Sequence, residues 1–331
     1  WGAGTLEFLP QDVYSTRSIP HVYSRYPLWD DPDLPRSVAA GEQYLPNAPT
    51  GGRETIVTSP VHARPQYVIQ MPGPGWMHVA AAVFTAACFL LLTVKVVIPA
   101  IICAVIAIAS CLVWVWNIDK GPDKGPVDIG GGYKLPVYVT GPMAHGWWAM
   151  IVLMIVAGSI FLSYVFSYLY LWTVSPEVWQ AGRAFLPSLS WPLATAGLLI
   201  ASAIVMRLAK SALPEPGERR LVVPVLILVS AALAIAGITA ELYGHWSNGL
   251  RPTETSYGAM VFMGGIVSAQ IIVAISVMSL FCAARHVAGL LDRVRWASLE
   301  NTTLLLYYVV GQALFGLLLI HGFPHIMGGG S

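Results

Sequence analysis

The sequence predicts an all-α membrane protein with seven transmembrane helices, and two observations carry this prediction. Residues 144–172 contain no charged residue, and a helix of that length, at ~1.5 Å per residue, exceeds the ~30 Å hydrocarbon core of a bilayer. Hydrophobic residues make up 56% of the chain and charged residues only 11%, which is too apolar for an ordinary soluble domain. The net charge of +1 gives no indication of nucleic-acid binding, and we expect none.

Residues 1–75 predict an extended, non-helical leader. They are rich in proline and contain no apolar run long enough to span a membrane. Proline fixes φ and removes a backbone donor, so residues 26–35 (YPLWDDPDLP) favour extended chain draped over a partner surface. A structureless segment of this length is unusual in a compact domain, which supports the expectation of a partner.

Two apolar runs follow, residues 76–97 and 98–118, and they predict a transmembrane hairpin. Pro99 suits the first turn of the second helix, and Lys95 near the tip is expected to extend to water. Residues 119–143 then form a loop with three consecutive glycines. Because no helix follows the glycines directly, we expect a flexible linker rather than a phosphate-binding loop.

Residues 144–172 begin the second group of helices. Ser159, Ser163 and Ser167 recur every four residues, which gives one face small enough for a neighbouring helix to approach closely. We therefore expect this helix at the centre of a bundle. Four more spans complete a five-helix bundle over residues 144–323, followed by a tail of residues 324–331; they are residues 191–208, 221–243, 257–284 and 302–323.

Lys and Arg residues predict the orientation of the chain. All 18 of them fall on one side of the predicted spans except Lys95, Arg183 and Arg251. Cytoplasmic loops are enriched in these residues. The leader and the loop of residues 119–143 are therefore expected in the cytoplasm, and the C-terminus outside.

The histidines do not predict a haem or copper site, because all lie in the leader or at or beyond the ends of spans, whereas axial ligation needs histidines that face the iron. His321 and His325 have the i, i+4 spacing of a metal pair, but Pro324 ends the helix between them and no carboxylate is close in sequence. We expect interface histidines. Glu241 and Glu300 lie close to helix ends and do not support a proton path, so no catalytic, cofactor-binding or metal-binding residue is predicted.

Basic residues beside the spans are candidates for binding anionic lipid headgroups. Arg285 and His286, at the end of the sixth span, are the strongest candidates, and Arg219 and Arg220, in the loop after the fourth span, are further ones. The alternative is that these side chains only mark topology.

Several blocks resemble a known family. Residues 1–7 (WGAGTLE), 18–20 (SIP) and 24–30 (SRYPLWD) resemble the end of subunit I of bacterial haem-copper cytochrome c oxidases. Residues 167–172 (SYLYLW) and 317–324 (LLLIHGFP) resemble subunit III, as in proteins in which subunits I and III are fused. The resemblance implies a subunit I-like tail over residues 1–30 and a cytoplasmic linker over residues 31–75. The expected contacts with subunit I are Trp1, Leu6, Arg25, Tyr26, Leu28 and Trp29.

The resemblance also implies a function. The chain is expected to be a non-catalytic part of a respiratory complex that transfers electrons from cytochrome c to O₂ and pumps protons. It implies haem and copper in subunit I, which is either fused to this chain or separate, with subunit II and cytochrome c or another donor as partners. It further implies a bacterial inner-membrane location and phospholipid in a cleft between the first two helices and the other five.

The sequence departs from the family in two places. An acidic residue that the family typically carries in the third helix aligns near Ala157 and Gly158, and a Trp-His-aromatic-Val-Asp motif aligns with residues 306–310 (LYYVV). Both acidic positions are lost, so no role that depends on them is expected here.

Two other classes compete with this interpretation. A retinal protein needs a buried lysine, and residues 302–323 contain none. A stand-alone multi-helix transporter would need interrupted helices and polar groups at the membrane midplane, for which Gln270 and Gln312 are candidates. No inverted repeat is evident, and the transporter interpretation leaves the leader unexplained.

Overall fold

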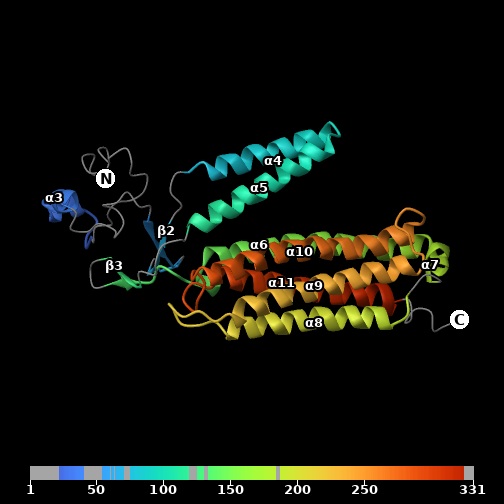
Figure 1. Cartoon of the computed structure of the whole chain (residues 1–331). Helices are drawn as coiled ribbons and strands as arrows, with labels where there is room; N and C mark the ends of the chain where they lie inside the picture. The colour runs from blue at the N-terminus through green and yellow to red at the C-terminus, as the bar shows by residue number, and fades with distance from the viewer. Residues whose placement is uncertain are drawn as a thin grey trace. The chain divides into compact units, whose positions relative to one another are not determined.

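The computed structural model describes residues 22–40, 54–59, 61–62, 64–70, 75–118, 125–129, 133–183 and 187–323. Trp1 and Leu6 of the predicted subunit I contacts, and His325, lie outside these residues. The chain forms two compact units, Trp1–Val139 and Thr140–Ser331, and Figure 1 shows the elements of both. Each unit is described by itself below.

The second unit is a bundle of five long helices. They are α6 (His145–Val174), α8 (Ser190–Ser211), α9 (Val222–Ser247), α10 (Ser256–Val287) and α11 (Ala297–Leu317), with a short α7 (Pro176–Arg183) between α6 and α8. The last helix ends in a π turn, η3 (Leu318–Gly322). These bounds lie close to the spans expected from hydropathy, because uninterrupted apolar runs leave the helix as the only way to satisfy the backbone in lipid.

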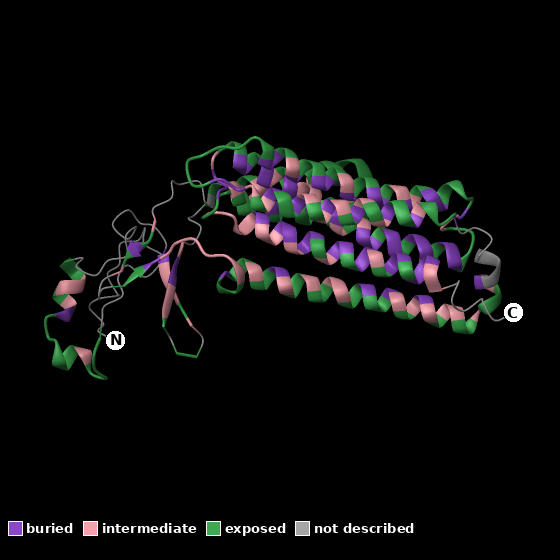
Figure 2. Ribbon diagram, turned by 90° about the horizontal axis from the view of Figure 1, so that it is seen from below, coloured by how far each residue is buried: buried purple, intermediate pink, exposed green. Residues whose placement is uncertain are grey.

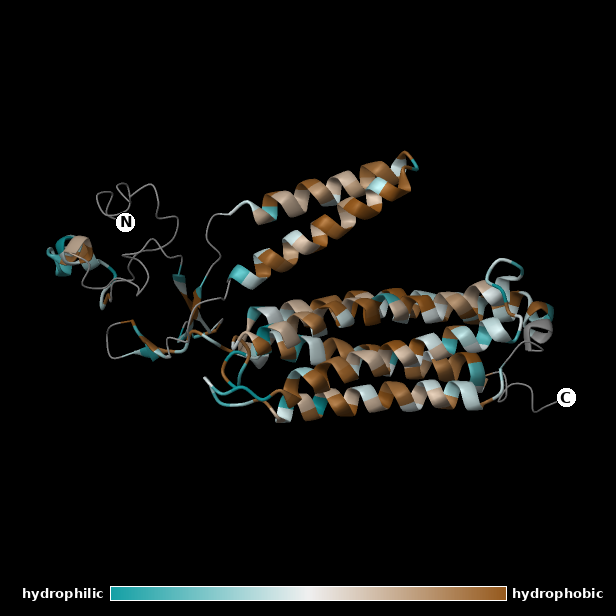
Figure 3. Ribbon diagram, in the orientation of Figure 1, coloured by the Kyte–Doolittle hydropathy of each residue, from teal (hydrophilic) through white to brown (hydrophobic). Residues whose placement is uncertain are grey.

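The described part of the chain contains six helices long and apolar enough to cross a membrane: α5 (Val97–Ile118) and the five long helices of the second unit. Figure 3 shows hydrophobic residues along all of them. The prediction of a mostly helical, multi-pass membrane protein is confirmed to this extent. The remaining predicted span is the shorter α4 (Met77–Thr93), of 17 residues, about 26 Å long. Seven membrane crossings therefore stay a prediction.

α4 ends earlier than expected because the chain reverses at the predicted hairpin tip. Lys95 has φ 62°, in the left-handed region that does not continue a right-handed helix. Three residues, 94–96, connect α4 to α5, and Pro99 lies in the first turn of α5 as expected.

The centre of the bundle is α11 rather than α6. In the apolar span that joins α11 and η3, 61% of the residues are buried, against 17% in α6; Figure 2 colours the buried residues purple. The expected central position of α6 was therefore wrong within this unit. Its buried positions include Phe161, Tyr164 and Tyr168, which are aromatic residues rather than serines.

The serine face of α6 is exposed instead. Ser159 and Ser163 each donate a hydrogen bond to the carbonyl four residues earlier, at 3.0 Å. A hydroxyl satisfied by its own helix needs no neighbouring helix, so the four-residue spacing did not identify the packing face within the bundle.

The leader is not free of regular structure, which corrects the expectation of an extended, non-helical segment. Its described part contains two short helices, α2 (Pro27–Asp30) and α3 (Leu34–Ala40), and two strands, β1 (Glu54–Thr58) and β2 (Pro65–Gln70). Pro27 and Pro35 fall at the first positions of α2 and α3, where a missing N–H costs nothing. Proline therefore marked helix starts here rather than the absence of helix.

β1 and β2 form an antiparallel hairpin, with Glu54 opposite Gln70 and Ile56 opposite Val68. The loop of residues 119–143 also contains strands, β3 (Val127–Asp128) and β4 (Lys134–Leu135). Val68 N donates to Pro136 O at 3.0 Å, which ties β2 to the end of this loop. The described part of the loop therefore contains regular structure, whereas the three glycines on which the expected flexible linker rests, residues 130–132, lie outside the described residues.

Candidate functional site

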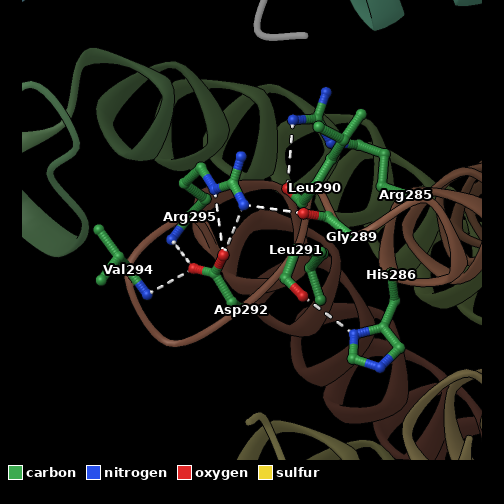
Figure 4. Close-up of polar contacts among 8 residues, drawn as sticks. All are labelled: Arg285, His286, Gly289, Leu290, Leu291, Asp292, Val294 and Arg295. Atoms are coloured by element: carbon green, nitrogen blue, oxygen red, sulfur yellow. Dashed lines mark hydrogen bonds and ion pairs between the residues drawn. The ribbon is translucent and has the colours of Figure 1, made fainter. Parts of the chain in front are cut away.

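The predicted lipid-binding residues lead to the turn between α10 and α11, residues 288–296. Figure 4 shows its polar contacts. Arg285 and His286, in the last turn of α10, are 5% and 2% exposed. The guanidinium of Arg285 donates to Leu290 O at 3.4 Å, and His286 Nδ1 lies 2.9 Å from Leu291 O. Both side chains therefore hold the turn against the end of their own helix.

An ion pair closes the turn. Asp292 Oδ1 accepts the backbone N–H groups of Val294 and Arg295, both at 2.9 Å. Asp292 Oδ2 accepts Arg295 Nη2 at 2.7 Å, and the same nitrogen donates to Gly289 O at 2.8 Å. Burial acts to raise the pKa of Asp292, but the hydrogen bonds from Arg295 and Val294 and the charge of Arg295 outweigh it, so the pKa lies below its ordinary value.

The turn is also bonded to the loop between α8 and α9. Arg293 Nε donates to Leu213 O at 2.9 Å, and its Nη1 pairs with Glu215 Oε1 at 2.6 Å. His286 Nε2 lies 3.1 Å from Arg220 O. Both groups that face the ring nitrogens of His286 are thus backbone carbonyls. This end of the bundle is thus a connected network of basic side chains and backbone carbonyls.

The network separates the four lipid candidates into two pairs. Arg285 and His286 are buried and use their polar groups within the protein, whereas Arg219 and Arg220 are exposed. Lipid binding by the four residues stays a prediction, and the geometry favours Arg219 and Arg220 as the side chains that a headgroup reaches.

The described subunit I contact candidates are exposed. Tyr26 is 68% and Trp29 84% exposed, with Leu28 and Arg25 also accessible around α2. This apolar surface has the character expected of a segment that docks on a partner, although contact with subunit I stays a prediction.

A second polar cluster lies inside the helices and was not predicted. Glu241 and His245 are in α9, and His321 is in η3, 80 residues further along the chain. All three are buried, at 5%, 2% and 4% exposed. His245 Nε2 and His321 Nε2 each lie 3.0 Å from Glu241 Oε1. The two rings stack with centroids 5.1 Å apart, so one carboxylate oxygen is faced by two imidazoles.

Two atoms of this cluster have no hydrogen-bond partner among the described residues, Glu241 Oε2 and His245 Nδ1. The hydroxyl of Tyr164, from α6, is also buried without a partner there. The ring of Tyr164 packs directly against Gly264 in α10. A Cβ added at Gly264 would lie 2.5 Å from Tyr164 Oη, so the close approach requires glycine there. Unsatisfied buried polar atoms are uncommon in native proteins and call for an explanation.

The cluster corrects the expected roles of the histidines. His321 was considered with His325 and without a carboxylate, but its carboxylate is Glu241 on another helix. His245 was set aside as a helix-end residue, yet it faces inward from the last two turns of α9. One signal was available: Glu241 and His245 are four residues apart and so share a helix face. The approach of His321 depends on tertiary packing, which sequence spacing does not reveal.

The two sites lie near opposite ends of α10, because α9 ends where α10 begins and the 288–296 turn follows the end of α10. Chemically, the turn presents cations, whereas the cluster offers one carboxylate and two imidazoles, which bind protons or metal ions. Comparison with protein-family models and with curated proteins found no match to this chain.

Proposed function

We propose that the chain is the subunit III-like part of a haem-copper cytochrome c oxidase of the fused subunit I and III type. The observation that carries the proposal is the resemblance of residues 1–30 to the end of subunit I, directly ahead of a multi-helix membrane domain that resembles subunit III. In its described part, this tail presents Tyr26 and Trp29 on its surface, as a segment that docks on a neighbouring subunit requires.

The role proposed for this chain is non-catalytic. Electron transfer from cytochrome c to O₂, coupled to proton pumping, takes place at haem and copper in subunit I, assisted by subunit II. This chain stabilises the catalytic subunit, supports proton uptake and binds phospholipid. The chain is therefore proposed as a component of a proton-translocating oxidoreductase, and its redox centres lie in the other subunits.

The proposal includes a seven-helix arrangement in a bacterial inner membrane. α4 and α5 form the first pair and the second unit supplies the other five helices, with a lipid-filled cleft between the two groups. The leader and the loops rich in Lys and Arg face the cytoplasm, and the C-terminus faces the periplasm. Supporting observations are the six apolar helices and the concentration of basic residues in the 212–221 loop and the 288–296 turn.

The test is an affinity purification of the chain from its native membrane in mild detergent, followed by a reduced-minus-oxidised optical spectrum and an intact mass. We expect haem a absorption, with subunit I either covalently continuous or tightly bound. A colourless, homogeneous chain would overturn the proposal.

A matched pair of variants tests the docking of the leader. Where subunit I is a separate polypeptide, Trp29→Ala is expected to lower co-purified haem several-fold, because large aromatic side chains dominate interface energies; where it is covalently continuous, the same variant is expected to lower the temperature at which the haem absorption is lost on heating. Val61→Ala, which changes an equally exposed residue (82%) in the β1–β2 hairpin, serves as the control. Equal haem recovery from the two variants, or equal temperatures of haem loss where subunit I is covalently continuous, would remove α2 from the interface.

The alternative is a stand-alone transporter, and one observation favours it: ionisable groups buried within membrane helices usually mark transport or proton paths, and Glu241 is such a group. The polar residues expected for it give less support. Gln270 is exposed, and Gln312 bonds to Tyr308 and Ser268 within the bundle. A colourless preparation would make this alternative the leading one.

A further inference from the structure

Three metal-binding side chains converge inside the second unit. One ligand atom from each of Glu241, His245 and His321, a carboxylate oxygen and two ring nitrogens, lies within 4.8 Å of the other two. We propose that Glu241, His245 and His321 form a binding site for a divalent transition-metal ion, with Zn²⁺ as the reference ion. The site is independent of the proposed oxidase role.

The spacing of the donor atoms suits one small ion. Both Nε2 atoms lie 3.0 Å from Glu241 Oε1. Ligand bonds of ~2.0–2.2 Å at tetrahedral angles place neighbouring donors about 3.3–3.6 Å apart. The three ligand atoms lie within 4.8 Å of one another, so adjustments of the side chains would bring them to the spacing that one ion requires.

The donor set is also chemically suited to zinc. Two imidazoles and one carboxylate supply three protein ligands, and a zinc site with three protein ligands keeps a fourth position for water or another small molecule. Imidazole with carboxylate selects transition ions over Ca²⁺ and Mg²⁺, which prefer oxygen donors alone.

Charge balance gives a second argument. A buried carboxylate is costly unless it is paired or coordinates a metal, and here its partners are two imidazoles that are neutral in their ordinary metal-binding form. Glu241 Oε2 has no hydrogen-bond partner among the described residues. A dication beside Oε1 would compensate the carboxylate charge, and a water on its fourth position would be a donor within reach of the site.

The local fold supports the same conclusion. α11 leaves α-helical geometry at Leu318, and the π turn that follows contains His321. π turns are rare and occur frequently at functional sites. In this turn His321 approaches α9, so an ion would cross-link two helix ends that are far apart in sequence.

The experiment uses the full chain, purified in detergent with whatever subunits it retains, treated with a chelator and dialysed. Zn²⁺ is then titrated and bound zinc is measured by elemental analysis. Co²⁺ is titrated separately, because its visible spectrum reports coordination. We expect about one Zn²⁺ per chain above the chelated baseline, and Co²⁺ bands of four-coordinate intensity with nitrogen and oxygen donors.

Variants assign the site to residues. Glu241→Gln and His321→Gln are each expected to weaken binding at least ~100-fold, since losing even an outer-shell partner costs 10–100-fold. His78→Gln is the matched control, because His78 is an exposed residue at the start of α4 and lies outside the cluster. Gel filtration and circular dichroism check that each variant remains folded.

Zinc and cobalt binding decide whether the cluster is a metal site. If the folded wild-type chain binds no Zn²⁺ and gives no Co²⁺ bands, the cluster is a hydrogen-bonded group and the proposal is wrong. Equal binding by wild type and Glu241→Gln contradicts it too. If the variants do not fold, the Co²⁺ spectrum of the wild-type chain decides. Haem content is measured in parallel, so failure of the oxidase proposal is distinguished from failure of the metal site.

Discussion

Asp292 and Arg295 show how much structure one ion pair organises at the basic end of the bundle. Their side chains are 3% and 7% exposed, and together they bond to backbone groups of three residues of the turn. The pair therefore fixes the path of the chain from α10 to α11, in addition to neutralising a buried arginine.

Removing the carboxylate is expected to destabilise the second unit. Asp292→Ala removes the carboxylate that pairs with Arg295 and that accepts the N–H groups of residues 294 and 295, and breaking such a buried pair costs about 3 kcal/mol. Thermal unfolding in detergent measures the loss. Glu215→Ala, which breaks an exposed pair with Arg293, is the control and is expected to cost less than about 1 kcal/mol. Equal losses would contradict the role given to Asp292.

The same pair predicts a pH dependence. Because the pKa of Asp292 is lowered in the folded chain, its stabilisation is complete above the ordinary aspartate pKa of about 3.9 and is lost as pH falls through the lower folded value. The difference in melting temperature between wild type and Asp292→Asn should therefore shrink as the pH is lowered below about 4. A difference that stayed constant down to the acid limit of folding would show that the ionised form is not what matters.

At Gly264, adding an atom rather than removing one is expected to destabilise the fold. Gly264→Ala places a Cβ against the hydroxyl of Tyr164, and overpacking of this sort costs ~1–3 kcal/mol. Gly311→Ala is the matched control, because nothing lies within 4 Å of its Cβ position and alanine favours the helix by up to ~1 kcal/mol. The melting temperatures should move in opposite directions, and a shared direction would contradict the tight approach of Tyr164.

At the scale of elements, α10 depends on its first turn. Thr255 is the N-cap, and its side chain accepts the backbone N–H of Gly258 at 3.0 Å. Thr255→Ala should lower stability by about 1 kcal/mol, and Thr255→Ser should largely retain it. Chemical unfolding of the detergent-solubilised chain compares the two, and equal loss from both would mean that the hydroxyl bond is not the source of the effect.

Hydropathy alone was enough to predict the long helices. Backbone N–H and C=O groups that lie in lipid must be hydrogen-bonded within the protein, and a helix satisfies them within one segment. Hydropathy was not enough to predict which face of α6 packs, since the serines satisfy themselves and the aromatic residues Phe161 and Tyr164 are buried instead. Nor did it predict the cluster: Glu241 and His245 were visible as a helix-spaced pair, but His321 arrives through tertiary packing and a local π turn. Spacing along the sequence reveals only neighbours on one helix, whereas the Glu241 cluster joins residues from two helices that are far apart in the sequence.

On the scale of the whole molecule, the second unit has a basic end and an end with the Glu241 cluster, separated by the length of α10. This asymmetry predicts that residues 212–221 face the cytoplasm and residues 248–255 the outside. Glu218→Cys and Glu254→Cys, both at exposed positions, can be labelled in intact cells with a membrane-impermeant maleimide. Glu254→Cys should react at once and Glu218→Cys only after permeabilisation; the reverse pattern would invert the topology.

Within the first unit, strand β2 precedes the helical pair α4 and α5 and strand β4 follows it, and the bond from Val68 N to Pro136 O joins the two sides. The segments that enter and leave the α4–α5 pair therefore lie next to each other. Segments whose ends lie close together are those that proteins insert or lose with least disturbance. In evolutionary terms, this arrangement makes the α4–α5 pair a removable module, which a lineage can delete or exchange while the strands on either side keep their places.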